Sequence, residues 1–575
     1  YDLRIGWHLL RGGQPQRGAD LLCMAGEHLF EATSFEDCIA PLEAALKVFS
    51  ANGDQSSRVA EVSYMLVAAG FYVDRDVAVR HRELAMQVLG AHSGLTRAQR
   101  WTRFLGPRFA FIAALMVTSM LRWLPFGRAR YGMPPVDALD QYLRVCVYSA
   151  GVAGFSFDTQ TLRECVAALQ PLRAINRMHV RNAIGLVDNL LNFNLGRLGT
   201  LMTKSQKVLA NIRANERITE EERALSLGGS RFQRGLVATR EGDASALEEI
   251  EELERLGPRI WALGALQLRT YFHMWRGESA EARRVWGDAE LEFVRLGALW
   301  QLHSIHQSSA AVTWSFVGDA LGLRRSIGSL EQQVEAGLCF SQHLCIARAE
   351  YETLAGHYEV ARTALKEAFA LLPDNEGLTR PWAMTAAAEC SLAAGEFQRA
   401  EKEAQEARAY CAGEEYGQRT FEFRATRIAA LAKSGQGHHD AAATMLDTLI
   451  ERAEKTDNPF MIGDAHEARA RVAFADGDPG TARRHCEAVT RFFVPTRNPV
   501  LVARSERLTR HCGLGPKAEL PDSGGGCIAT EVFDTMQTSI GEVLSLLSGC
   551  PTATSRAQRA LETLVQDAGA ERGYL

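Results

Sequence analysis

The chain has 575 residues, which exceeds one ordinary globular domain, so we expect several domains or a repeat array. Its formal charge of −5 arises from 64 basic and 69 acidic side chains, and this balance excludes the basic footprint typical of nucleic-acid-binding proteins. Alanine, leucine, glutamate and arginine are abundant, which favours helices.

The first 50 residues show two helices joined by a turn at Gly12 and Gly13. After a second turn, small and apolar residues recur at helical spacing, at Phe35, Cys38, Ala44 and Ala45. The runs HLLRGG and RGADLLCMAGEHLF resemble the stretch that follows the ATPase core in large bacterial signal-transduction ATPases of the STAND/AAA type, which include MalT-like regulators. The resemblance implies a helical-repeat arm behind a nucleotide-binding module. Because the chain begins at Tyr1 rather than methionine, we expect it to be an excerpt from a longer polypeptide.

Residues 51–184 continue the helical periodicity in irregular units, with one recognisable helix pair around Gly70. An apolar run from Phe109 to Leu121 lies between Arg108 and Arg122. It is shorter than the roughly 20 residues that a membrane-spanning helix needs, so we expect a buried helix there.

The segment from Trp123 to Pro135 is rich in glycine and proline and predicts a loop. We expect its Arg128 and Arg130 to be solvated, because no glycine-rich phosphate cradle lies beside them. Thr219 and Glu222 fit a capping box that opens a later helix.

From about Gly185 a regular repeat begins, with successive turn glycines 35, 41, 38, 39, 42 and 40 residues apart. These glycines are Gly242, Gly277, Gly318, Gly356, Gly395, Gly437 and Gly477. Seven residues before each lies a small residue, in order Gly235, Thr270, Ala311, Ala349, Ala388, Ala430 and Ala470. Five residues after each lies Leu247, Ala282, Leu323, Ala361, Ala400, Ala442 or Ala482. Small residues at these places allow two helices of a unit to cross closely.

The unit from Cys345 to Pro373 is the best formed, with Gly356, Tyr358, Ala361 and Ala368 at the places where tetratricopeptide (TPR) units carry such residues. The pattern therefore predicts an all-α, TPR-like α-solenoid over residues 185–510, a right-handed superhelix of antiparallel helix pairs preceded by an irregular helical region over residues 1–184. Such an array buries its core only by stacking neighbours, and it presents a concave face.

Beyond the array, residues 511–527 are rich in Gly, Pro and Ser and read as a linker. Residues 528–575 predict linking helices, the first with apolar residues at Val532, Met536, Ile540, Val543 and Leu547. The final run, RALETLVQDAGAERGYL, resembles the entrance to a GAF domain. The order ATPase, TPR array, linking helix and GAF is that of large bacterial serine/threonine or histidine kinase sensors, and the resemblance implies such a parent.

The sequence carries no catalytic motif: a GxxxxGK(S/T) phosphate loop, the kinase HRD and DFG motifs, HExxH and GxSxG are all missing. We assign no catalytic, cofactor-binding or metal-ligating residue and no cofactor. The cluster Cys339, His343 and Cys345 lacks a fourth zinc ligand nearby, and the 12 scattered cysteines are expected to be buried thiols in a reducing cytoplasm.

Three His-containing clusters are interpreted as structural. In His485–Cys486 and in His511–Cys512 the two side chains point about 100° apart on a helix, so neither pair forms a nucleophile–base dyad. His438, His439 and Asp440 are expected in a solvent-exposed repeat turn. The recurring tryptophans are expected to pack between repeats rather than line a ligand groove; they are Trp261, Trp275, Trp286, Trp300 and Trp314.

Together with the two resemblances, which imply the bacterial signalling parent, these features predict a non-enzymatic sensor or scaffold arm of such a protein, in the cytoplasm. Its concave face would bind a peptide, a partner domain or an effector, and would regulate an attached ATPase or kinase and a GAF module through the segment after Cys527. No direct nucleic-acid or membrane partner is expected. The alternatives are the arm of a MalT-like STAND transcriptional regulator and a free-standing adaptor.

Overall fold

The computed structural model describes residues 2–32, 34–51, 57–101, 107–122, 133–175, 178–214, 220–256, 259–296, 299–372, 377–413 and 417–512. The chain divides into two compact units, residues 1–514 and 515–575, and the described residues all belong to the first. The predicted linking helices, the GAF-like end, the loop with Arg128 and Arg130, and Thr219 of the capping box lie outside the described residues. No described helix is long and apolar enough to cross a membrane.

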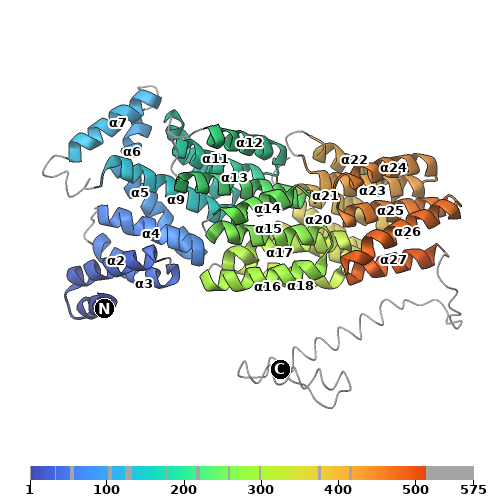
Figure 1. Ribbon diagram of the computed structural model, residues 1–575, viewed down its shortest axis with the longest axis horizontal. Helices are drawn as coiled ribbons and strands as arrows, with labels where there is room; N and C mark the ends of the chain where they lie inside the picture. The colour runs from blue at the N-terminus through green and yellow to red at the C-terminus, as the bar shows by residue number, and fades with distance from the viewer. Residues whose placement is uncertain are drawn as a thin grey trace, which may run out of the picture. The chain divides into compact units, whose positions relative to one another are not determined.

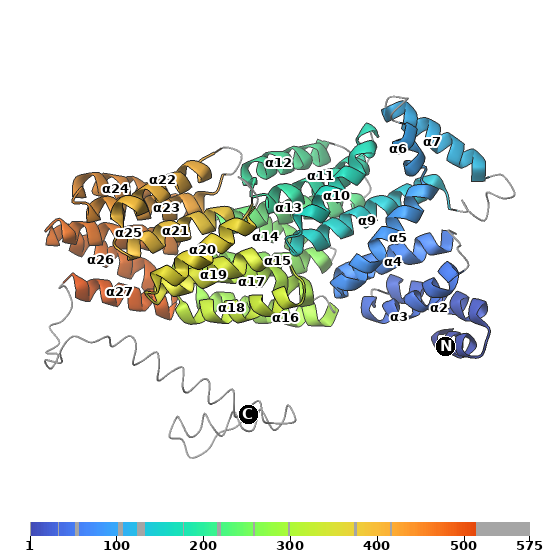
Figure 2. The same cartoon turned by 180° about the vertical axis from the view of Figure 1, so that it is seen from behind.

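The regular elements of the described residues are all helical (Figures 1 and 2). In chain order they are α1 (Asp2–Arg11), α2 (Pro15–Glu31), α3 (Phe35–Ala51), α4 (Ser57–Val73), α5 (Arg75–His92), α6 (Leu95–Trp101), α7 (Pro107–Arg122), α9 (Pro135–Phe155), α10 (Thr159–Leu169), η1 (Gln170–Ala174), α11 (Met178–Asn194), α12 (Leu198–Ala214), α13 (Glu220–Arg240), α14 (Ala246–Arg255), α15 (Arg259–Trp275), α16 (Ser279–Leu296), α17 (Leu299–Val317), α18 (Ala320–Glu335), α19 (Ser341–Leu354), α20 (Tyr358–Leu371), α21 (Arg380–Ala393), α22 (Phe397–Cys411), α23 (Arg419–Gly435), α24 (His439–Glu454), α25 (Pro459–Ala475), α26 (Pro479–Phe493), η2 (Val494–Thr496) and α27 (Pro499–His511). Consecutive helices pack as pairs and the pairs stack, which makes the fold an all-α, TPR-like solenoid.

The predicted repeat is confirmed at its turns. All seven turn glycines have φ between +62° and +86°, a conformation that glycine adopts without strain. The seven small residues upstream of them are all buried. Of the seven downstream residues only Leu247 is half-buried, because α14 begins at Ala246 and that alanine occupies the buried place instead. The best-formed unit folds as α19 and α20, and α20 ends two residues before Pro373.

The repeat also extends further toward the N-terminus than the glycine pattern indicates. Gly196, with φ of +74°, joins α11 to α12, and Phe157, with φ of +56°, holds the same place between α9 and α10. A search based on glycine cannot find Phe157. Helix α11 spans residue 185, where the sequence suggested that the regular array begins.

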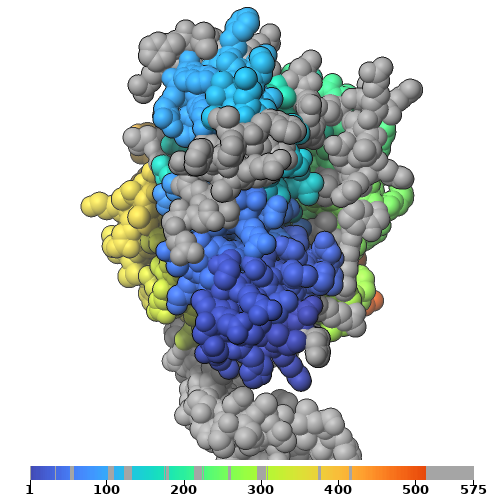
Figure 3. Space-filling view, turned by 90° about the vertical axis from the view of Figure 1, so that its left-hand side faces the viewer, coloured from blue at the N-terminus to red at the C-terminus, as the bar shows by residue number. Residues whose placement is uncertain are grey.

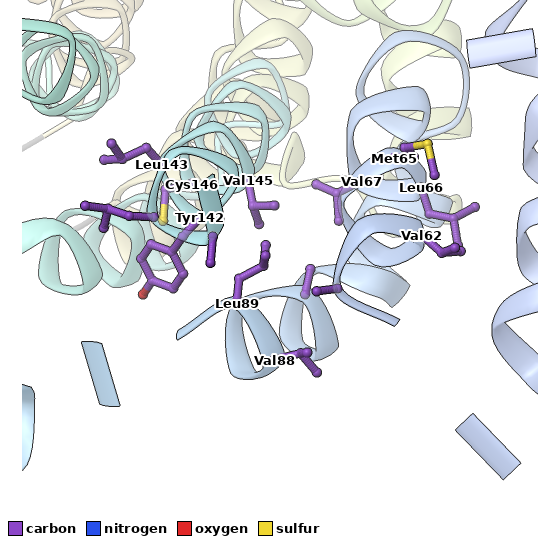
Figure 4. Packing of buried hydrophobic residues seen from close by; sticks show 14 of the residues in the cluster. Val62, Met65, Leu66, Val67, Val88, Leu89, Tyr142, Leu143, Val145 and Cys146 are labelled. Carbon is purple, nitrogen blue, oxygen red and sulfur yellow. The ribbon is translucent and has the colours of Figure 1, made fainter. Parts of the chain in front are cut away.

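The N-terminal helices share one hydrophobic core. In Figure 4, Val67 of α4 lies on the side of its helix that faces Val145 of α9 and Leu89 of α5, and the three belong to one cluster of buried residues. The predicted helix pair around Gly70 is confirmed as α4 and α5, but Gly70 lies inside α4 rather than at the turn. A Cβ atom at Gly70 would lie 2.4 Å from the backbone nitrogen of Ala78, so glycine allows the two helices to touch.

Helix α7 corrects the expectation of a buried helix over residues 109–121. Its Ala110 and Phe111 are buried, but Phe109, Met116 and Met120 are 73%, 58% and 71% exposed. These exposed residues lie on one face of the helix, because α7 packs chiefly on α6 and is not enclosed by neighbours on both sides. Figure 3 shows α6 and α7 in light blue at the N-terminal end, above α1 to α3 in dark blue.

The solenoid winds back on itself, with five helix pairs to each superhelical turn. The loop between the two helices of one pair therefore meets the pair that comes five pairs later in the chain. Backbone N–H groups of Gly377 and Leu378 donate to the carbonyls of Leu195 and Asn194, both at 3.1 Å. The same relation recurs along the array, through Thr420 Oγ1 to Arg240 O (2.9 Å), Asn458 Nδ2 to Trp275 O (3.2 Å) and Arg504 Nη1 to Val317 O (3.2 Å). The inner sides of the units from α9 to α15 therefore face the next superhelical turn, and the open part of the predicted concave face lies further along, between α17 and α27.

Candidate functional site

An open groove of about 560 Å³ lies among the first helices of the last units, α17, α19, α21, α23, α25 and α27. Apart from Arg504 and Arg507 of α27, its charged side chains come from fixed places in the repeat, 13, 10 and 6 residues before the turn glycine. Positions three and four residues apart share one face of a helix, so these places face inward in every unit. They hold Arg424, Asp464, Arg427, Glu467, Glu350, Glu389 and Arg471.

An ion pair between Glu350 of α19 and Arg424 of α23 lines the deep side of the groove. The two guanidinium nitrogens of Arg424 donate to the two carboxylate oxygens at 2.6 and 2.9 Å. Trp382 Nε1 also donates to Glu350, at 3.1 Å. Burial alone would lower the pKa of Arg424, but Glu350 raises it above the usual value. A bidentate, buried pair of this kind fixes the spacing of α19, α21 and α23.

The charges continue toward the C-terminus as an alternating chain. Arg427 of α23 contacts Glu389 and lies 3.2 Å from Asp464 of α25. Arg504 of α27 contacts Asp464 and donates to Glu467 at 2.9 Å. Burial alone would raise the pKa of Asp464, but Arg427 and Arg504 lower it below its usual value. Asp464 therefore stays ionised, and each of the three carboxylates contacts an arginine of a neighbouring first helix.

Two cations at the open side of the groove remain accessible. Arg471 pairs with Glu467 at 2.8 Å, and its side chain is 53% exposed. Arg507 is exposed and has no ion-pair partner among the described residues. Leu354, which is 46% exposed, and the half-buried Leu392 supply apolar surface beside them. The groove thus offers apolar contacts and a small excess of positive charge, which suits the binding of a peptide segment.

The sequence did not identify these groove residues, although a signal for them was present. The turn glycines fix the register, and the inward places of four units carry charged residues where an ordinary core would be apolar. Arg504 lies outside this pattern, because the series of turn glycines ends at Gly477.

The tryptophans are confirmed as packing residues where their side chains are described. Trp275 is buried, and Trp261, Trp286 and Trp314 are half-buried against hydrophobic clusters. None of the four lines the groove, although Trp275 lines a second, smaller cavity. The side chain of Trp300 lies outside the described residues.

The structure separates the Cys and His residues that the sequence considered together. Eight of the ten described cysteines are buried and all ten are free, but Cys339 is exposed, against expectation. Burial raises the pKa of the Cys38 thiol to about 12, which makes it a poor nucleophile. His343 is buried against Phe340 and Phe157. No group of three or more His, Cys, Asp or Glu within the described ranges is arranged to hold a metal ion.

The structure also favours a structural role for the adjacent pairs His485–Cys486 and His511–Cys512. Cys486 and Cys512 are buried, whereas His511 is exposed. His485 meets His466 instead of its neighbouring cysteine, with 2.8 Å between their Nδ1 atoms. His438 and Asp440 are exposed at the start of α24, as expected for a repeat turn, whereas His439 is half-buried and its Nδ1 lies 2.9 Å from Ser434 Oγ.

No family model and no curated protein matches this chain. Among solved structures, the APC/C hetero-tetramer Cut9–Hcn1 is similar at 15% identity and a TM-score of 0.38, over 89% of this chain and 95% of that one. Yeast Tom70 is similar at 13% identity and a TM-score of 0.26, over 86% and 96%. A STAND protein with a tetratricopeptide repeat sensor from Pyrococcus horikoshii is similar at 12% identity and a TM-score of 0.30, over 87% and 74%.

Proposed function

We propose that this chain is a protein-interaction arm that binds a peptide or a partner domain in the groove between α17 and α27. The observation that supports it is the groove itself, with Arg471 and Arg507 accessible beside the apolar Leu354 and Leu392. The deeper charges pair with one another and hold the helices in place. The preferred partner segment carries apolar side chains and at least one acidic group.

The regulatory part of the proposal follows from the resemblance to STAND-type signalling proteins. In a bacterial signalling protein of the cytoplasm, a partner bound in the groove favours one arrangement of the arm and biases an attached ATPase or kinase through the segment after Cys527. The arm itself has no catalytic activity in this proposal. The sequence on either side of this chain distinguishes the alternatives: a GAF body after Leu575 favours the sensor kinase, and a DNA-binding helix-turn-helix favours the transcriptional regulator.

The binding test uses the full chain and a peptide-display library, followed by fluorescence anisotropy of the selected peptides. The double variant Arg471→Glu/Arg507→Glu places negative charge in the groove and is expected to weaken binding by at least about tenfold, which corresponds to about 1.4 kcal/mol. The control is Arg284→Glu/Arg399→Glu on α16 and α22, where both arginines are exposed outside the groove. Its affinity should stay within about twofold of the unmodified chain.

Equal affinities for the groove variant and the control variant would refute the groove as the binding site. Circular dichroism of both variants checks that the helical content is unchanged. ATP hydrolysis by the purified chain would contradict the non-enzymatic part of the proposal.

A further inference from the structure

Helix α7 presents a stripe of exposed apolar side chains. The stripe consists of Phe109, Ile112, Met116 and Met120, which are 73%, 51%, 58% and 71% exposed. Successive residues of a helix are rotated by about 100°, so these four positions lie within a sector of about 80°. Each residue adds about 1.5 Å along the helix axis, so the stripe is about 17 Å long.

The opposite face of α7 attaches the helix to the rest of the unit. Ala110, Ala114 and Thr118 are buried there. Arg97 of α6 donates through Nη1 to Thr118 Oγ1 at 2.8 Å. Since this face packs on α6, the apolar stripe points outward, and Figures 1 and 2 show α6 and α7 at the edge of the unit.

An apolar outward face is unusual for a helix in water. The outer face of a surface helix normally carries charged or polar side chains. Here residues 109–121 contain no Asp, Glu, Lys or Arg. Single exposed apolar residues are common on proteins, but four on one stripe mark a surface that meets a protein or a membrane. The stripe is therefore a docking surface, and the charges around it indicate the kind of partner.

The sequence around α7 is strongly basic. Residues 84–136 contain seven arginines and no Asp, Glu or Lys, whereas the whole chain has a formal charge of −5. One of the seven, Arg100 of α6, is exposed. The region is also aromatic, since seven of the 31 residues from 101 to 131 are Phe, Trp or Tyr, against 8% in the whole chain. Arginines together with aromatic and other apolar side chains are typical of helices that lie in the headgroup layer of anionic membranes.

We propose that α7 docks this chain on the surface of an anionic lipid bilayer, with the apolar stripe buried below the headgroups. The helix has 16 residues, fewer than the roughly 20 that cross a bilayer, so it lies in the plane of the surface. An anionic bilayer presents negative charge over its whole surface, which matches a region of this length without an acidic residue. A second copy of the chain is a poorer partner, because contact between two α7 helices would bring two basic regions together.

The proposal differs from the expectation drawn from the sequence. The sequence predicts a buried helix over residues 109–121 and no membrane partner, whereas the structure exposes one side of that helix. No residue of α6 or α7 lines the open groove among the described helices, so the lipid-binding surface and the groove do not overlap. The inference goes beyond the proposed peptide binding, and its test needs no peptide.

The test measures flotation of the full chain with vesicles of phosphatidylcholine, either alone or with about 30% phosphatidylserine. We expect binding to the anionic vesicles, and weaker binding as sodium chloride rises from about 0.1 M to about 0.5 M. The double variant Met116→Glu/Met120→Glu places two carboxylates in the stripe and should weaken binding by at least about tenfold. The control Leu291→Glu/Val360→Glu adds the same charge at residues that are 53% and 55% exposed on α16 and α20. Its binding should stay within about twofold of the unmodified chain.

No binding of the unmodified chain to anionic vesicles, or equal losses in the two variants, would overturn the proposal. Sedimentation equilibrium without lipid tests the other occupant: a dimer that Met116→Glu/Met120→Glu abolishes would assign the stripe to a second copy and refute lipid docking. If that variant fails to fold, hydrogen exchange of the unmodified chain decides. Slower exchange in α7 with anionic vesicles supports the proposal, and unchanged exchange in α7 refutes it.

Discussion

The winding of the solenoid back on itself can be tested at Asn458. This side chain has two roles, because its Oδ1 caps α25 by accepting the N–H groups of Phe460 and Met461 at 3.0 and 3.2 Å. Its Nδ2 donates to the carbonyl of Trp275, which belongs to the previous superhelical turn. The substitution Asn458→Asp keeps the cap, since Asp and Asn cap helices equally well, and removes only the donor.

The expected loss follows from the buried position of Asn458, which is 1% exposed. Removal of the hydrogen bond costs about 0.5–1.5 kcal/mol, and a buried carbonyl left facing a carboxylate costs about 1–3 kcal/mol more. We therefore expect Asn458→Asp to lower the free energy of unfolding by about 2–4 kcal/mol. Urea denaturation followed by circular dichroism measures this loss, and hydrogen exchange at the end of α15 reports on it locally.

Asn498 provides the matched control. It caps α27 in the same way, accepting from Val500 at 3.0 Å and from Leu501 at 3.5 Å, and it is 2% exposed. Its Nδ2 donates to nothing among the described residues. Asn498→Asp is expected to change the free energy of unfolding by at most about 1 kcal/mol, because the helix N-terminus stabilises a carboxylate. Equal losses for the two variants would refute the contact between turns.

Three further predictions concern the turns and the helix crossings. Gly242→Ala should lower the melting temperature more than Gly477→Ala, although both glycines have positive φ, because a Cβ atom at Gly242 would lie 2.1 Å from Asn458 Nδ2 and a Cβ atom at Gly477 would meet nothing within 4 Å. Equal shifts of the melting temperature would contradict the packing of the turn at Gly242 against Asn458. Ala361→Leu should cost about 1–3 kcal/mol by overpacking the crossing of α19 and α20, and an unchanged melting temperature would count against the repeat phase. Glu241 should make stability pH-dependent, because burial raises its pKa from 4.5 to about 7 in the folded state. The folded chain then binds the proton more tightly than the unfolded chain, so the free energy of unfolding falls by about 3 kcal/mol as the pH rises from about 4.5 through 7. A series of urea denaturations at different pH should show this fall, and Glu241→Gln should remove it.

The sequence determined the helix pairs, since the features that specify them are local. A glycine at positive φ and a small residue seven places before it act within one unit of about 40 residues, as Gly356 with Ala349 and Gly437 with Ala430 show. The turn at Phe157 escaped prediction because a phenylalanine holds a conformation that the pattern reserves for glycine. The exposed face of α7 escaped because an apolar sequence does not say whether neighbours cover it.

The candidate site was beyond the sequence for a different reason. The groove charges lie at predictable inward places, but their pairing joins residues from different units, as in Glu350 with Arg424, which are 74 residues apart. Which carboxylate meets which guanidinium group depends on how the units are rotated relative to one another. That rotation comes from side-chain packing at every interface between units, and no local pattern reports it.

The sequence by itself therefore determined that this chain is a stack of helix pairs, and where most of the turns fall. Only the tertiary structure decided that the stack winds back on itself after five units, so that Arg240 meets Thr420 of the next superhelical turn and the accessible groove lies near the C-terminal helices. The physical reason is that small rotations between neighbouring units add up along the array. Contacts between residues about 180 positions apart, such as Asn458 with Trp275, exist only when their sum brings one turn of the superhelix onto the next.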